Sequence, residues 1–92
     1  MTNAIITMRV MPETPEVNLE DIEVKITQIL DTEVGEGDRK VNIEPVAFGL
    51  KALVMVFVMD EAKGSPDPIA EKVTQIDGVQ SAEISDVRRA IG

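Results

Sequence analysis

One run of residues, Leu50 to Met59, constrains the fold more than any other part of the sequence, because it is apolar at nearly every position. The side chains of a β-strand alternate between the two faces of a sheet. One face would hold Leu50, Ala52, Val54, Val56 and Val58, and the other would hold Leu53, Met55, Phe57 and Met59. A strand that is apolar on both faces is typical of the middle of a sheet. The run therefore predicts a central strand.

Three shorter segments alternate between apolar and polar side chains and predict the remaining strands. They are residues 4–11, residues 40–44 and residues 79–87, the last with Ala82 and Ile84 directed inward. Pro12 and Pro15 follow the first segment and are expected to end it, because proline lacks an amide donor. The stretch from Pro45 to Gly49 interrupts the alternation and predicts a loop.

Apolar residues at helical spacing predict two helices. The first has Asn18 as its N-cap and an apolar stripe of Leu19, Ile22, Ile26, Ile29 and Leu30. Gly35 to Asp38 is expected to form a polar turn after it. The second has Ser65 or Asp67 as its cap and a stripe of Ile69, Val73 and Ile76. Gly78 is expected to end it in a left-handed conformation.

The order strand, helix, strand, strand, helix, strand predicts a single domain over residues 1–92. This is an α+β, ferredoxin-like βαββαβ two-layer sandwich, in which two helices cover one face of a four-stranded antiparallel sheet. The first and third strands are central in this plan. We expect Leu53, Met55, Phe57 and Met59 to lie on the open side of the sheet. Because that surface is too apolar for water, something else should cover it.

The chain contains no cysteine, histidine, tryptophan or tyrosine, and this excludes several kinds of chemistry. Zinc fingers, iron–sulfur clusters, thiol nucleophiles and Ser/His/Asp triads all need His or Cys. No apolar run reaches the roughly 18 residues of a membrane span. The lack of cysteine fits a reducing compartment. We therefore expect a cytoplasmic protein with no cofactor and no membrane partner.

The charge of the chain is acidic and unevenly distributed. Nine lysines and arginines against 17 acidic residues give a net charge of −8, which disfavours direct contact with nucleic acid. The stretch from Glu13 to Asp38 contains nine acidic residues and one base, Lys25. The favoured interpretation of this stretch is a solvated helix face.

No grouping of reactive side chains predicts a catalytic site, and adjacent acidic pairs are interpreted as surface charge. Phe57 is interpreted as a residue of the core or of a covered sheet face, because RNA-binding sheets need several aromatics on a basic surface. Phe48 lies in the loop between Pro45 and Gly49, where it either folds back over the sheet edge or anchors a partner. The pattern leaves both possibilities open. The residues alone indicate an interaction module.

Three motifs resemble archaeal translation elongation factor one beta in type, order and spacing. They are Val-Met-Pro-Glu at residues 10–13, Glu-Pro-Val-Ala-Phe-Gly-Leu at residues 44–50 and Asp-Val-Arg-Arg at residues 86–89. The resemblance covers the whole chain. It implies a guanine nucleotide exchange factor with a ferredoxin-like catalytic domain. The implied partner is elongation factor one alpha, the GTPase that delivers aminoacyl-tRNA to the ribosome.

The resemblance also implies which residues bind the partner. The family's exposed loop aromatic matches Phe48 and is implied to insert into a pocket of the GTPase, while the carboxyl-terminal segment reaches toward its magnesium site. Eukaryotic relatives use a lysine near the carboxyl terminus, where this chain ends in Ala-Ile-Gly at residues 90–92. Arg88 or Arg89 is the candidate for that positive charge, although each on pattern alone is an ordinary surface charge. The expected partner-binding residues are Pro45, Phe48, Gly49, Arg88, Arg89 and Ile91.

Two alternatives share the same fold, and the sequence leaves the oligomeric state open. The first is a small-molecule-sensing regulatory module that dimerises through its open sheet face, with Met55, Phe57 and Met59 in the interface. The second is an enzyme of acylphosphatase type, which ranks lower because the chain has no recognisable phosphate loop.

Overall fold

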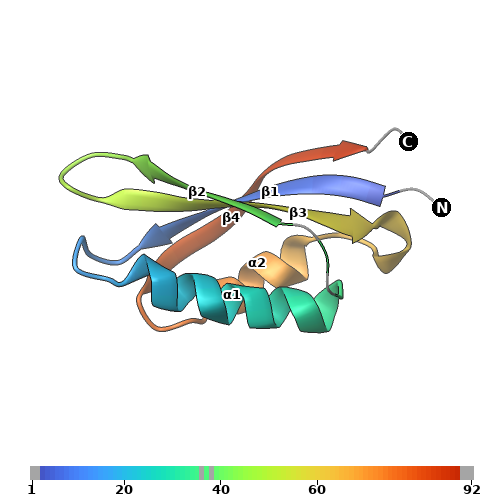
Figure 1. Ribbon diagram of the computed structural model, residues 1–92, viewed down its shortest axis with the longest axis horizontal. Helices are drawn as coiled ribbons and strands as arrows, with labels where there is room; N and C mark the ends of the chain where they lie inside the picture. The colour runs from blue at the N-terminus through green and yellow to red at the C-terminus, as the bar shows by residue number, and fades with distance from the viewer. Residues whose placement is uncertain (1–2, 36, 38, 90–92) are drawn as a thin grey trace.

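The computed structural model describes residues 3–35, 37 and 39–89. This part of the chain forms four strands, two α-helices and one short 3₁₀ helix. Their bounds are β1 Asn3–Pro12, α1 Leu19–Glu33, β2 Arg39–Pro45, β3 Lys51–Asp60, η1 Glu61–Lys63, α2 Asp67–Thr74 and β4 Val79–Arg89. The strands pair antiparallel in the order β2-β3-β1-β4, and both helices lie on one face of the sheet (Figure 1). The expected ferredoxin-like α+β fold is confirmed.

The central strands β1 and β3 contribute most of the sheet's share of the core. The buried side chains are Ile6, Met8 and Val10 of β1 and Leu53, Met55, Phe57 and Met59 of β3, each 5% exposed or less. The strand register pairs Ile6 with Phe57 and Met8 with Met55, and directly paired residues share a face. These side chains pack in one core cluster with the apolar stripes of both helices. They therefore lie between the sheet and the helices.

The prediction that Leu53, Met55, Phe57 and Met59 lie on the open side of the sheet is wrong. The open face of β3 instead carries the alternate set, Ala52, Val54, Val56 and Val58. Because both sets are apolar, the alternation defines two faces without saying which one meets the helices. That choice depends on the pairing with β1, whose buried face is apolar at every alternate position.

Helix α1 begins and packs as its sequence predicts. The Asn18 side-chain oxygen accepts hydrogen bonds from the backbone N–H groups of Glu20 at 2.9 Å and Asp21 at 3.4 Å. These bonds satisfy amides that have no partner inside the helix. Ile22, Ile26 and Leu30 are buried on the core side of α1.

Helix α2 is shorter than the apolar pattern suggests. It ends at Thr74, four residues before Gly78, so Gly78 does not cap it directly. Gly78 does have a left-handed backbone, with φ of 94°, in the turn that leads into β4. Ile76 lies beyond the helix and still packs against the core. At the other end, Pro66 occupies the N-cap position with no side-chain cap hydrogen bond, so the prediction that Ser65 or Asp67 caps the helix is wrong. The Ser65 hydroxyl accepts a hydrogen bond from the backbone N–H of Asp67, the first helical residue, at 3.1 Å.

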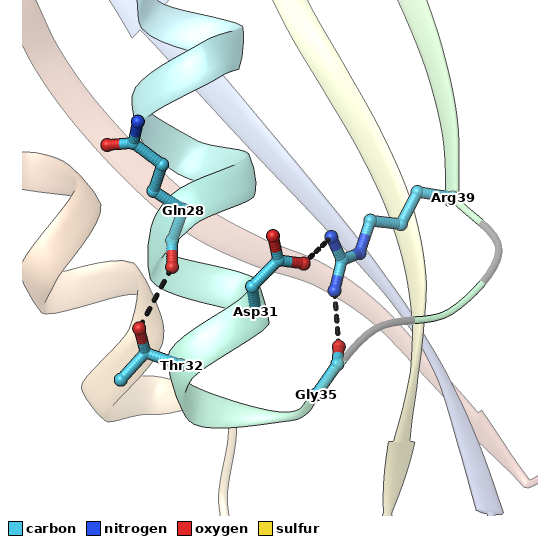
Figure 2. A network of polar contacts seen from close by, with 5 residues as sticks. All are labelled: Gln28, Asp31, Thr32, Gly35 and Arg39. Atoms are coloured by element: carbon cyan, nitrogen blue, oxygen red, sulfur yellow. Dashed lines mark hydrogen bonds and ion pairs between the residues drawn. The ribbon is translucent and has the colours of Figure 1, made fainter.

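An ion-pair network joins the end of α1 to the start of β2 (Figure 2). Arg39 donates one hydrogen bond to the carboxylate of Asp31 at 2.6 Å and another to the backbone carbonyl of Gly35 at 2.5 Å. Thr32 donates to the carbonyl of Gln28, one turn earlier in the helix, at 3.1 Å. The guanidinium thus holds the first residue of the edge strand against the carboxyl-terminal turn of the helix.

Candidate functional site

The turn between β2 and β3 has an unusual residue in its first central position. The backbone N–H of Leu50 donates to the carbonyl of Ala47 at 3.0 Å, which closes a turn with Phe48 and Gly49 in the middle. Phe48 has φ of 57° and Gly49 has φ of 78°. Two positive φ values in succession are the signature of a type I′ turn, whose first central position favours asparagine, aspartate or glycine.

Phe48 is the only described residue other than glycine with positive φ, and its side chain is 96% exposed. The possibility that it folds back over the sheet edge is therefore wrong. A left-handed conformation costs an ordinary L-residue about 1 kcal/mol or more. The ring makes up none of that cost by packing, because almost all of its surface meets solvent. Nothing in the fold of the chain itself explains a phenylalanine at this position.

The base of the hairpin is braced and lies next to a groove. The backbone N–H of Val46 donates to the carbonyl of Leu50 at 2.8 Å. A Cβ placed on Gly49 would lie 3.9 Å from the ring of Pro15 in the β1–α1 loop, which is an ordinary van der Waals distance. A groove of about 560 Å³ opens beside this contact, lined by Pro12, Pro15, Val17, Asn18, Leu19, Glu20, Ile43, Gly49 and Lys51. Sequence reasoning missed this groove, because it joins segments that no local pattern connects.

Arg88 and Arg89 lie at the end of β4, which extends two residues further than expected. Arg88 pairs with Ile5 in the strand register and Arg89 with Ala4, so the two side chains are on opposite faces of the sheet. Arg88 contacts the carboxylate of Asp86 at 2.8 Å and Arg89 that of Glu61 at 3.0 Å. Exposed ion pairs of this kind contribute at most about 1 kcal/mol. Ile91 lies outside the described residues.

The structure does not bring the hairpin tip and the two arginines together. They lie at opposite ends of the sheet, along the longest axis of the molecule (Figure 1). Through β1, the register aligns Arg89 with Met59 of β3, whereas Phe48 precedes Lys51 at the other end of that strand. At about 3.3 Å per residue, the span from Lys51 to Met59 alone is about 26 Å. The expected partner-binding residues that the structure describes thus lie in two separate regions of the surface.

The sequence of the chain also matches a known protein family. The sequence matches the family described as "EF-1 guanine nucleotide exchange domain" over residues 5–90. The chain belongs to this family. The expected resemblance is thereby confirmed.

Relatives of similar length carry one name. This exchange domain is 43% identical over 88 residues to "Elongation factor 1-beta" of Pyrococcus furiosus, which covers 95% of this chain and 94% of the relative. It is 40% identical to the protein of the same name from Thermococcus gammatolerans, with the same coverage. It is 36% identical over 89 residues to that of Methanosphaera stadtmanae, covering 97% of this chain and 98% of the relative.

The exchange domain has few other features that suggest chemistry. Within residues 3–35, 37 and 39–89, no three acidic side chains come close enough together to hold a metal ion. No described helix is long and apolar enough to cross a membrane. Buried polar or charged residues are also absent from the described chain.

Proposed function

We propose that this exchange domain promotes the replacement of GDP by GTP on elongation factor one alpha during protein synthesis. Family membership and the names of its relatives support an exchange role in translation elongation. The observation that carries the proposal to a specific contact is the isolated Phe48 ring, 96% exposed on a left-handed residue. A hairpin that presents an apolar ring to solvent offers that ring to a pocket on another protein.

The proposed mechanism needs no covalent chemistry and no cofactor. The exchange domain binds the nucleotide-free GTPase more tightly than the nucleotide-bound form. By thermodynamic linkage, it must then weaken nucleotide binding by the same factor. GDP leaves faster, and the nucleotide that replaces it depends on the supply in solution. A chain without His or Cys has all the groups that this mechanism requires.

Phe48 serves as the anchor of this contact. Burying a phenylalanine side chain stabilises a complex by about 1.5–3 kcal/mol, which is enough for one residue to dominate an interface. The turn holds Phe48 through the hydrogen bond from Leu50 to Ala47, and a second bond from Val46 to Leu50 closes the loop around it. A loop that is already ordered loses less conformational entropy when it binds. Pro45 and Gly49 act in this proposal by shaping the loop.

The carboxyl-terminal end supplies the second contact. Arg88, Arg89 and Ile91 are proposed to bind near the nucleotide and magnesium site of the GTPase, where positive charge competes with the ion. Because Arg88 and Arg89 each contact a carboxylate in the free chain, those exposed pairs must exchange for a partner group. Their small net contribution makes that exchange easy.

A nucleotide-release assay tests the proposal. Elongation factor one alpha is loaded with a fluorescent GDP analogue, excess unlabelled GTP is added, and the release rate is measured against the concentration of the exchange domain. We expect the rate to rise and then saturate. A rate that stays at its intrinsic value at all concentrations would contradict the proposal.

The residues expected to form the dimer interface of the sensing module do not lie on the open face of the sheet. Met55, Phe57 and Met59 are buried between the sheet and the helices and do not reach the open face.

A further inference from the structure

The open face of the sheet is apolar where such faces are usually polar. An antiparallel sheet with one solvated face normally alternates apolar-in and polar-out. On β3 the side chains of this face are Ala52, Val54, Val56 and Val58, with no polar residue among them. Ala52 is fully buried, while Val54 and Val56 are half-buried. Val58 is 43% exposed, and its neighbour on β1, Ile5, is 36% exposed. This pattern is not needed for the core, which lies on the other side.

The strand register shows how these side chains lie relative to one another. One row across the sheet runs from Val58 to Ile5 to Arg88. The next row runs from Lys40 to Val56, Thr7 and Asp86. Ile5, Val56 and Val58 border a shallow hollow of about 210 Å³ together with Lys40. We call these three apolar residues with Lys40 and Arg88 the open-face patch.

The rim of the open-face patch carries charges of both signs. Lys40 lies at its β2 edge and makes no ion pair with any residue that the structure describes. At the β4 edge, Arg88 is paired with Asp86, which lies in the next row of the same face. Lys40 thus leaves a positive charge beside the apolar residues, in contrast to the stretch from Glu13 to Asp38, where acidic residues outnumber bases nine to one.

A second copy of the chain is a poor occupant for this surface. Each copy has a net charge of −8, so two copies repel each other at long range.

We propose that the open-face patch is a second docking surface for the GTPase, continuous with the carboxyl-terminal contact. The inference rests on the proposed function, because it needs the same partner. Arg88 shares a row with Ile5 and Val58, and the last residues of the chain follow it directly. Arg89 is on the other face with Glu61. The geometry therefore assigns Arg88, and not Arg89, to the open-face patch.

The first experiment removes the apolar character of the patch without changing its shape. Valine and threonine are nearly isosteric, and both favour strands. We expect Val56→Thr/Val58→Thr to weaken binding to nucleotide-free GTPase about tenfold, measured by titration calorimetry. The matched control is Val24→Thr on the outer face of α1, where Val24 is 56% exposed. We expect that control to bind like the unchanged protein, and thermal unfolding checks that both variants are folded.

The second experiment tests the charges. Lys40→Glu is expected to weaken binding several-fold at low salt and less at high salt, because the attraction is screened. Lys25→Glu makes the same charge change on α1, and we expect it to have a smaller effect. Methyl signals of Ile5, Val56 and Val58 should shift on addition of the GTPase in NMR spectra, while those of Val24 should not.

The outcomes separate this inference from the proposed function. If nucleotide release is accelerated but Val56→Thr/Val58→Thr binds like Val24→Thr and the patch methyl signals do not move, the inference is overturned and the proposed function survives. If release is not accelerated at all, the proposed function is overturned, and the inference is overturned with it because it needs the same partner. If sedimentation shows a dimer that the paired threonine substitutions dissociate, the patch belongs to a second copy and the inference is overturned.

Discussion

The two phenylalanines of the chain lie in opposite environments. Phe57 is 1% exposed in the middle of β3, packed among the side chains of the core. Phe48 is 96% exposed at the tip of the β2–β3 hairpin, on a left-handed residue. The first is explained by the fold, since its burial stabilises the sheet against the helices. The fold does not explain the second, and in the proposed function it is the GTPase that buries the ring.

The largest effect is expected at the buried phenylalanine. Phe57→Ala should lower the free energy of unfolding by about 3–5 kcal/mol, through lost burial and the cavity left behind. For a small domain this is a large part of the total stability. Denaturant unfolding measures the change. At a temperature where the variant is still folded, nucleotide release should be close to normal. A direct loss of exchange by folded protein would contradict the division between the two phenylalanines.

Phe48→Ala should show the reverse behaviour. We expect exchange efficiency on the GTPase to fall by about 30- to 150-fold, which corresponds to about 2–3 kcal/mol of lost binding at an anchor residue. Unfolding should be unchanged within about 0.5 kcal/mol, since the ring contacts almost nothing in the chain.

The matched control for this substitution is Val46→Ala in the same loop. Val46 is also an exposed apolar residue, but it is the ring of Phe48 that stands alone at the tip. We expect the Val46 variant to retain most of its exchange activity. Equal losses at both positions would indicate that the whole loop acts as a general apolar contact and would contradict a single anchor.

Most of the fold follows from the sequence, because local signals determine it. Alternation located the strands, and Asn18 marked the start of α1 as its hydrogen bonds confirm. The buried face of β3 could not be predicted, since both of its faces are apolar and a long-range pairing with β1 decides between them. Residues 45–49 predict a loop, but no local pattern gives the positive φ of Phe48 or tells whether its ring is buried.

The candidate site was only partly predictable for a related reason. The resemblance points to residues at both ends of the sheet, but the sequence pattern does not tell how far apart they lie. Antiparallel pairing places the β2–β3 turn and the end of β4 at opposite ends. The groove beside the hairpin needed the same long-range information, because Pro15 and Ile43 belong to segments far apart in the chain.

A smaller effect of opposite sign is expected when Phe48 is replaced by asparagine. Phe48→Asn should stabilise the chain by about 0.5–1 kcal/mol, because asparagine tolerates the left-handed conformation that the turn requires. The same variant should lose exchange activity as Phe48→Ala does. Thermal unfolding and nucleotide release, measured on one preparation, test both parts. A less stable variant would show that the ring contributes to the turn after all.

The smallest effects on stability are expected at the end of β4. Here a comparison of Arg88 and Arg89 tests whether the open face of the sheet contacts the partner. Each arginine forms one exposed ion pair, so Arg88→Ala and Arg89→Ala should each change the free energy of unfolding by less than about 1 kcal/mol. Their effects on exchange should differ. Arg88 belongs both to the carboxyl-terminal contact and to the open face that it shares with Ile5, so its loss should slow nucleotide release several-fold, whereas Arg89 lies on the other face and its loss should slow release less. If Arg89→Ala proved the more damaging in the release assay, the partner would have to reach around the edge of β4, and the open face would no longer be the surface that continues the carboxyl-terminal contact.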